Sequence, residues 1–386
     1  MRKNKKMTKG VDKNIIILAI ISSFVYIIFF CQMSQPQEEI KPVKGQIIKG
    51  KIASYWERLP NNVVHCLLCP RSCIIPPGKT GTCQARENIN GTLYTLTYGN
   101  PCAVHVDPIE KKPFFHFLPK TLSFSIATAG CNVRCIHCQN WEISQASPKE
   151  TFNYILTPKD IATLAKRTGS ATVAYTYTEP IIFIEYVLEC AKETKKLNLR
   201  NVMHSNGYIN VEPLKELCGA LDAINIDLKG FRDEVYNELM QGAKLSPVLN
   251  TLKTIKSYKN VWLEITNLII PTKNDDPRDI NAMCSWIYKN LGPDVPLHFS
   301  RFYPNYLLTS LPSTPIQTLE NAYKIAKKNG LRYVYIGNVP GSEYEDTYCW
   351  NCGRKLIDRQ GFTVISNHIV DGKCKFCHAR IAGVWQ

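Results

Sequence analysis

The sequence lacks three patterns that would place it in a common class of protein. No G-x-G-x-x-G follows the first predicted strand, at residues 122–129, so the fingerprint of a dinucleotide-binding sheet is missing. No small-residue A-x-A site follows the apolar run near the N-terminus, which argues against a cleaved signal peptide. No fourth cysteine lies near the three at positions 131, 135 and 138, so that group does not supply the four ligands of a structural zinc site.

Negatively charged residues are in the minority. The 386 residues include 32 Asp and Glu against 47 Lys and Arg, a formal net charge of +15. About a third of the excess lies in the first 13 residues, which contain Arg2, Lys3, Lys5, Lys6, Lys9 and Lys13. Thiolates bound to metal ions would lower the charge further. The charge is therefore weak evidence for nucleic-acid binding, and no nucleic-acid partner is expected.

Residues 15–31, IIILAIISSFVYIIFFC, are almost wholly apolar and carry no charge. A run of this length is at the short end of those that span a bilayer. A polar linker separates it from the rest of the chain. We predict an uncleaved single-pass anchor that places the protein at a membrane, with a cleaved signal as the alternative. The side of the membrane that holds the remaining chain stays open.

Cysteine is abundant, with 16 in the chain, and most of these residues are clustered. The three clusters are Cys66, Cys69, Cys73 and Cys83; Cys131, Cys135 and Cys138; and Cys349, Cys352, Cys374 and Cys377. Paired C-x2-C units in a chain long enough to bury a core indicate metal sites rather than disulfides. The clusters point to a reducing compartment, or to metal loading before export.

From residue 121 to 340, apolar β-branched runs alternate with helical stretches. This alternation predicts parallel strands with right-handed helical crossovers. About six such units predict an α/β fold of the partial (β/α)6 TIM-barrel type. We expect four parts: a basic tail, anchor and linker at 1–48, an N-terminal cysteine-rich module at 49–120, the barrel at 121–340 and a zinc-ribbon-like module at 341–386.

In such barrels the chemistry lies where strands end and loops begin. The predicted strand ends carry polar residues: the loop from Cys131 onward, Glu179, Ser205 with Asn206, Asp227 with Lys229, Arg301, and Asn338. Any one of these could be a solvated loop residue. Because polar residues occupy the same position in several successive units, we expect them to gather at one rim.

The three-cysteine loop, CNVRCIHCQN at 131–140, follows the first barrel strand. Thiolates are the usual ligands of a 4Fe–4S cluster, which needs four. Three protein ligands leave one iron open, and an open position on a metal is where a substrate or cofactor binds. The loop therefore predicts a reactive cluster at the barrel rim.

Beyond this loop, the chain resembles the radical S-adenosylmethionine (SAM) enzyme of the AmmeMemoRadiSam system, a group related to pyruvate formate-lyase activating enzymes. The resemblance runs from about residue 50 to the C-terminus. It rests on CLLCPRSC, GTCQAREN, VDPIEKKPFFHF, GCNVRCIHCQNWEISQ, YTYTEP, HSNGY, NIDLKGF, LEITNLIIPTKND, HFSRFYPNY and VYIGNVPG. It implies an oxidoreductase in which a 4Fe–4S cluster on Cys131, Cys135 and Cys138 cleaves SAM to methionine and a 5′-deoxyadenosyl radical that abstracts hydrogen from a substrate.

The resemblance also implies residues that bind SAM. Glu179 matches the glutamate of the family's glycine–glycine–glutamate motif, although Tyr177 and Thr178 replace the glycines. Asn206, Asp227 and Lys229 lie where ribose and carboxylate contacts are expected, and Lys229 could instead pair with Asp227. His137, next to the third cysteine, could stack near the adenine; the alternative is a cluster ligand.

Two further cysteine groups flank the barrel. Near the C-terminus, two C-x2-C units 21 residues apart form a zinc-ribbon pattern that supplies four thiolates from Cys349, Cys352, Cys374 and Cys377. The N-terminal group C-x2-C-x3-C-x9-C, from Cys66, Cys69, Cys73 and Cys83, could hold zinc or an auxiliary iron–sulfur cluster.

Two other functions stay open. The chain could be an activating enzyme that places a glycyl radical on a partner protein, or a zinc-stabilised RNA-binding module. Expected partners are a flavodoxin- or ferredoxin-like electron donor and Memo-like and Amme-like proteins. The sequence names no substrate.

Overall fold

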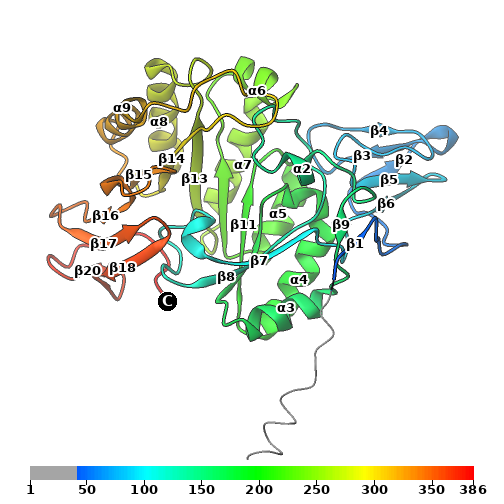
Figure 1. Cartoon of the computed structure of the whole chain (residues 1–386), viewed down its shortest axis with the longest axis horizontal. Coiled ribbons are helices and arrows are strands. Elements are labelled where there is room, and N and C mark those ends of the chain that lie inside the picture. Colours follow the sequence, from blue (N-terminus) through cyan, green and yellow to red (C-terminus); the bar gives the residue numbers. More distant parts are fainter. Residues whose placement is uncertain (1–40) are drawn as a thin grey trace, which may run out of the picture. The chain divides into compact units, whose positions relative to one another are not determined.

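An eight-stranded sheet forms the centre of the protein in this computed structural model, which describes residues 41–386 (Figure 1). Its strand order is β15-β14-β13-β12-β11-β10-β8-β7. Seven strands are parallel: β8 (Leu122–Ala127), β10 (Thr172–Tyr175), β11 (Arg200–Ser205), β12 (Ala223–Asp227), β13 (Trp262–Ile269), β14 (Leu297–Arg301) and β15 (Val334–Gly337). β7 (Ala103–Pro108) runs antiparallel to β8. Within the described residues β7 and β15 do not pair, so the sheet is open.

Helices connect the parallel strands in sequence order. They are α3 (Pro158–Arg167), α4 (Ile184–Lys196), α5 (Val211–Ala220), α6 (Asp233–Met240), α7 (Leu245–Ser257), α8 (Pro277–Leu291) and α9 (Ile316–Lys328). Neighbouring helices pack together in the pairs α3–α4, α4–α5, α5–α7, α7–α8 and α8–α9. A partly parallel α/β sheet with helical crossovers is the class that the alternating sequence predicts.

The parallel strands are buried on both faces. Every residue of β10 is buried, and so are five of the six in β8. Strands covered on both sides are apolar and β-branched along their whole length instead of alternating with polar residues. The largest apolar core joins these strands to the inner faces of the helices.

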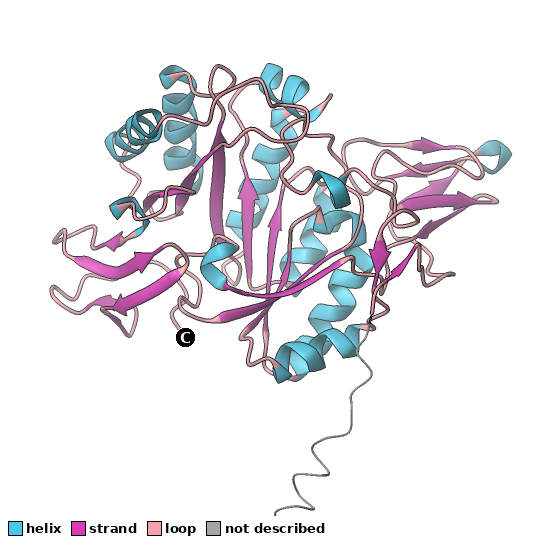
Figure 2. Cartoon of the chain, viewed as in Figure 1, coloured by secondary structure: helices cyan, strands magenta, loops and turns pink. Residues whose placement is uncertain are grey.

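The N-terminal region is built from short strands and loops (Figure 2). β2 (Trp56–Arg58), β3 (Val64–Cys66) and β4 (Ile74–Ile75) form one antiparallel sheet, with η1 (Pro60–Asn62) between β2 and β3. β5 (Arg86–Ile89) and β6 (Thr92–Thr95) form a hairpin, and β1 (Val43–Lys44) pairs with β9 (Phe152–Asn153). The stretch 49–120 also supplies β7 to the central sheet, followed by η2 (Ile109–Lys111), so the predicted module shares a sheet with the barrel.

The C-terminal region is likewise strand-rich. After η4 (Glu343–Glu345) come β16 (Thr347–Tyr348), β17 (Lys355–Gln360) and β18 (Thr363–Asn367) in one antiparallel sheet. β19 (Ile369–Val370) pairs with β20 (Lys373–Cys374). The chain end returns to the barrel, where Leu118 donates its N–H to the Val384 carbonyl at 2.8 Å.

The expectation of a single-pass membrane anchor needs correction. Across residues 41–386 the structure contains no helix that is both long and apolar enough to cross a bilayer. The run 15–31, on which the expectation was based, lies outside the described residues. Neither the anchor nor the membrane location is supported.

Candidate active site

A cavity of about 490 Å³ lies at the carboxyl ends of the parallel strands. Its walls bring together residues that follow β8, β10, β11 and β12, as expected for a barrel whose rim carries the chemistry. The sequence-predicted residues that line it are Cys131, Cys135, His137, Cys138, Glu179, Ser205, Asn206, Asp227 and Lys229. Of the other two residues predicted at the rim, Asn338 lines the cavity as well, whereas Arg301 does not.

The loop that carries the three cysteines is held by backbone hydrogen bonds. Gly130 donates to the Ile143 carbonyl at 2.8 Å, just after α2 (Trp141–Ser144) begins, and Ile136 donates to the Leu239 carbonyl at 3.0 Å. All three cysteines are free thiols. Within residues 41–386 one cysteine group has all its sulfur atoms within 4.8 Å of one another, and it is the C-terminal group. The three loop thiols are not gathered as closely as the thiols of that group.

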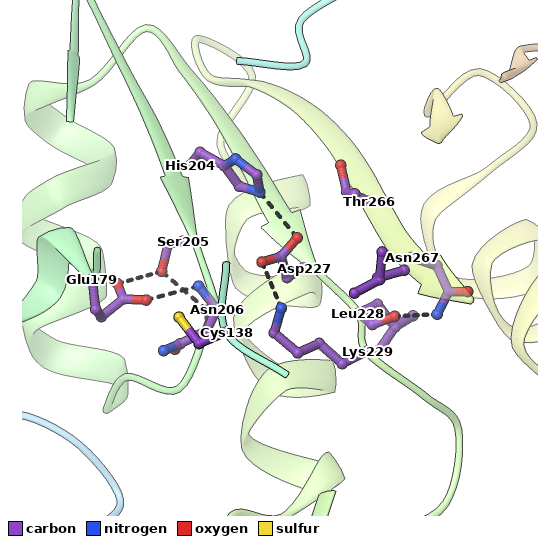
Figure 3. A network of polar contacts seen from close by, with 12 residues as sticks. Cys138, Glu179, His204, Ser205, Asn206, Asp227, Leu228, Lys229, Thr266 and Asn267 are labelled. Carbon is purple, nitrogen blue, oxygen red and sulfur yellow. Dashed lines mark hydrogen bonds and ion pairs between the residues drawn. The ribbon is translucent and has the colours of Figure 1, made fainter. Parts of the chain in front are cut away.

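Glu179 lies four residues after the end of β10 and is buried. One carboxylate oxygen accepts from Ser205 Oγ at 2.8 Å and from the Ile181 N–H at 3.2 Å, and the other accepts from the Asn206 N–H at 2.8 Å (Figure 3). Burial raises the pKa of Glu179 to about 7, although these hydrogen bonds act to lower it. The site therefore orients a carboxyl group that titrates near neutrality.

Asp227 and Lys229 follow β12 and pair with each other. Lys229 Nζ lies 2.9 Å from one Asp227 oxygen, and His204 Nε2 lies 3.0 Å from the other (Figure 3). These two partners hold the pKa of Asp227 well below its usual range, and Asp227 raises the pKa of Lys229. Of the two roles left open for Lys229, the structure shows the pairing with Asp227.

Asn206 supports the cysteine loop. Its side-chain amide donates to Asn132 Oδ1 at 2.8 Å, and its own Oδ1 accepts from the Tyr208 N–H at 2.8 Å. Asn132 in turn donates to the Tyr208 carbonyl at 2.7 Å. The nitrogen and the oxygen of the Asn206 side-chain amide are thus both hydrogen-bonded within the protein. Through Asn132, which follows Cys131, they connect the cysteine loop to the end of β11.

His137 is 4% exposed, and its Nδ1 has no hydrogen-bond partner. Burial lowers the pKa of this imidazole to about 3, so the ring is neutral at pH 7. A buried ring nitrogen without a partner at the wall of a polar cavity is the kind of group that a bound molecule satisfies.

Sequence reasoning missed a second polar group at this cavity. Lys112 is buried, with its Nζ 2.6 Å from Asp107 Oδ2 and 3.1 Å from the Tyr177 hydroxyl, which also donates to Asp107. Burial lowers the pKa of Lys112 to about 8. The signal was VDPIEKK, in which Asp107 precedes Lys111 and Lys112 by four and five residues.

Tyr177 replaces a glycine of the family's glycine–glycine–glutamate motif, and its backbone conformation is unusual for a tyrosine. Its φ is +67°, in the left-handed region that favours glycine. The backbone therefore keeps a glycine-type conformation although the residue is a tyrosine. The Tyr177 hydroxyl, bound to Asp107, helps to hold that conformation.

The C-terminal cysteines form a compact group. Cys349 Sγ lies 3.6 Å from Cys377 Sγ, and Cys352 Sγ lies 3.8 Å from Cys374 Sγ. These separations exceed the length of a disulfide, about 2.05 Å. They match the distance of about 3.8 Å between sulfurs that bind one tetrahedral zinc ion through bonds of about 2.3 Å.

Comparison with known proteins identifies a superfamily to which the chain is similar. The model of the radical SAM superfamily matches residues 125–285, which contain the three-cysteine loop and Glu179. An uncharacterized protein (MJ0808) of Methanocaldococcus jannaschii is 47% identical over 331 residues, which cover 85% of this chain and 98% of that protein.

More distant relatives have names that state an activity. The pyruvate formate-lyase-activating enzyme of Listeria monocytogenes is 24% identical over 179 residues, covering 43% of this chain and 69% of that enzyme. Among solved structures, a radical SAM methyltransferase from Sphaerobacter thermophilus aligns with a TM-score of 0.46 and 12% identity, over 59% of this chain and 71% of that chain.

Proposed function

We propose that this chain, which belongs to the radical SAM superfamily, binds a 4Fe–4S cluster through Cys131, Cys135 and Cys138 and uses SAM to abstract hydrogen from its substrate. Membership of the superfamily implies an enzyme of radical chemistry, with a 4Fe–4S cluster and SAM. When bound, the cluster supplies the electron that cleaves SAM to methionine and the 5′-deoxyadenosyl radical. The observation that carries the assignment is the placement of three free thiols and Glu179 on one cavity.

The residues of the chain have separate tasks in this proposal. Glu179, fixed by three hydrogen bonds, accepts a hydrogen bond from the amino group of SAM. The neutral ring of His137 stacks near the adenine and offers Nδ1. The ion pair of Lys229 and Asp227 would contact the polar groups of the cofactor. Asn206 holds the cysteine loop in place through its hydrogen bond to Asn132.

The test is the cleavage of SAM by the full chain. The protein is reconstituted anaerobically with iron and sulfide, reduced with dithionite and assayed for 5′-deoxyadenosine. We expect product from the wild type, none above background from Cys135→Ala, and wild-type amounts from Cys102→Ala, which alters a half-buried thiol outside the cavity. Product from Cys135→Ala, or no product from protein with a full cluster, would reject the proposal.

We further propose that Cys349, Cys352, Cys374 and Cys377 bind structural zinc. Their tetrahedral spacing supports this assignment. We also interpret the open parallel sheet as a partial (β/α)6 barrel, bordered by the N-terminal cysteine-rich module at 49–120 and the zinc-ribbon-like module at 341–386.

The system in which the enzyme works is proposed on the sequence motifs. Ten segments between residue 50 and the C-terminus resemble the radical enzyme of the AmmeMemoRadiSam system. Memo-like and Amme-like proteins, with a flavodoxin- or ferredoxin-like electron donor, are therefore the proposed partners. Relation to an activating enzyme also keeps a partner protein among the candidate substrates.

A further inference from the structure

Four cysteines outside the active site surround a second, smaller cavity. Cys66 ends β3, Cys69 and Cys73 lie in the turn to β4, and Cys83 lies in the loop before β5. All four line a cavity of about 20 Å³, together with Arg71, Arg86 and Asn132. Each is a free thiol, and Cys73 is the most accessible of them. Nothing in the chemistry of the first cavity requires this group.

The local fold directs these side chains to one point. The Cys66 N–H donates to the Cys73 carbonyl at 2.9 Å, and the Ser72 N–H donates to the Cys69 carbonyl at 3.1 Å, which closes a tight turn between the cysteines. Ser72 has φ +48°, a conformation that such a turn requires. This turn brings the thiols of one short segment to the same cavity.

The spacing of the sulfurs favours a cluster over one ion. Four sulfurs that bind zinc each lie about 2.3 Å from its centre, so no water-sized void remains between them. The C-terminal cysteines show this compact spacing, with all sulfurs within 4.8 Å of one another. Among the described residues the N-terminal four are not gathered this closely, and they line the cavity of about 20 Å³ instead. The loop thiols of the first cavity, also among the described residues, are likewise not gathered within that distance.

Charged donors complete the second cavity. Arg86 is 1% exposed, and its Nε has no hydrogen-bond partner, while its other two nitrogens contact the Ser54 carbonyl and Glu185. Arg71 donates to the carbonyls of Asn132, Met240 and Gln241, which places a second guanidinium in the wall. A cluster with four thiolates is anionic, and its sulfurs accept N–H donors. Arg86 Nε thus supplies the donor that such a cluster would satisfy.

We propose that Cys66, Cys69, Cys73 and Cys83 bind an auxiliary 4Fe–4S cluster with a full set of four protein ligands. This cluster lies directly behind the catalytic loop, because Asn132 lines the second cavity while its neighbours Cys131 and Val133 line the first. Gly130 packs on the same group, since a side chain there would meet the Cys83 carbonyl. The site is closed, so it takes an inorganic cluster and no substrate.

The experiment measures metal content and spin in the full chain, reconstituted with iron and sulfide. We expect about eight irons per wild-type chain and about four in a Cys131→Ala/Cys135→Ala/Cys138→Ala variant, which leaves the second cavity intact. That variant should keep the reduced-cluster signal in electron paramagnetic resonance. Adding Cys69→Ser and Cys83→Ser to it should remove both the iron and the signal, whereas adding Cys102→Ser should remove neither.

Zinc content separates the alternatives. If the triple alanine variant holds background iron and the wild type holds about two zinc ions per chain, the group is a zinc site and the proposal is wrong. Iron that persists after Cys69→Ser and Cys83→Ser would also overturn it. The triple variant lacks the cysteines proposed to hold the catalytic cluster, so its iron content tests the second site independently of SAM cleavage. Because this variant keeps all four N-terminal cysteines, the test does not depend on an N-terminal variant that fails to fold.

Discussion

At the residue scale, Glu179 shows how burial and hydrogen bonding act in opposite directions on one carboxyl group. Its three donors, Ser205 Oγ and the N–H groups of Asn206 and Ile181, favour the charged form. Burial opposes them and prevails, so its pKa rises to about 7. A cationic amino group placed against this carboxylate would favour the charged form again.

Replacing Glu179 should weaken cofactor binding. Glu179→Gln keeps the shape of the side chain but removes its charge, so we expect the affinity for SAM to fall about tenfold or more, roughly 1.4 kcal/mol or above. Isothermal titration of the reconstituted protein measures this. Glu142→Gln, an exposed change on α2, serves as the control. Equal affinities for the two variants would remove Glu179 from the cofactor site.

At the element scale, the turn from β8 into the cysteine loop depends on one close approach. Gly130 has φ +100°, and a Cβ there would lie 2.3 Å from the Cys83 carbonyl oxygen. Gly169, in the turn before β10, also has positive φ (+69°) but meets nothing within 4 Å. The two glycines therefore share a conformational need but differ in the space around them.

Alanine substitutions at Gly130 and Gly169 should separate the cost of a positive φ from the cost of a steric clash between the new Cβ and its surroundings. Gly169→Ala carries only the backbone cost, and we expect the free energy of unfolding to fall by about 1–2 kcal/mol. Gly130→Ala must also displace the backbone at Cys83, so we expect a larger fall and a loss of bound iron. Denaturant unfolding and iron analysis measure both effects. Similar losses in the two variants, with full iron content, would contradict the close packing.

At the same scale, two threonines that each precede a proline use their hydroxyl groups differently. Thr157 precedes a proline and caps α3: it accepts from the Asp160 N–H while the Asp160 carboxylate accepts from Thr157. Thr314 also precedes a proline, and the sequence suggests the same role. Instead its hydroxyl donates to the Ile269 carbonyl and accepts from the Phe302 N–H, and α9 begins two residues later without a side-chain cap. The Thr314 hydroxyl therefore binds buried backbone groups at the ends of β13 and β14 and does not cap the helix that follows it.

At the scale of the whole molecule, His116 joins the barrel to the chain end. Its Nδ1 lies 2.6 Å from the Ala382 carbonyl and its Nε2 lies 2.5 Å from the Tyr335 hydroxyl of β15. This geometry suits a neutral ring that donates from Nδ1 and accepts at Nε2. Burial lowers the pKa of His116 to about 4, below its ordinary value of 6.5.

The pH dependence of stability should report this contact. The unfolded state takes up a proton at His116 near pH 6.5, whereas the folded state resists it until about pH 4, so the stabilisation is present above pH 6.5 and is lost as the pH falls through this window. The slope is at most about 1.4 kcal/mol per pH unit. We expect His116→Gln to lose this part of the slope in denaturant unfolding. The exposed His105→Gln should keep it; a wild-type slope in His116→Gln would refute the assignment.

The sequence by itself determined the parts of this protein that depend on local pattern. Alternating apolar runs and helical stretches indicated an α/β sheet with parallel strands, and the spacing of Cys131, Cys135 and Cys138 indicated a three-ligand site. The strand-end rule placed Glu179 and Asp227 on one cavity because the carboxyl ends of parallel strands meet at one edge. Each of these features is encoded within a few residues.

Only the tertiary structure decided how distant segments use their polar groups. β7 of the N-terminal region pairs with β8, Asn206 donates to Asn132 at the wall of the cavity, and Lys112 contacts Tyr177, 65 residues further along the chain. A buried polar group takes the partner that the fold brings within hydrogen-bond distance, because leaving it unpaired costs about 1–3 kcal/mol. That partner is set by packing between segments far apart in the chain, which local sequence pattern does not encode.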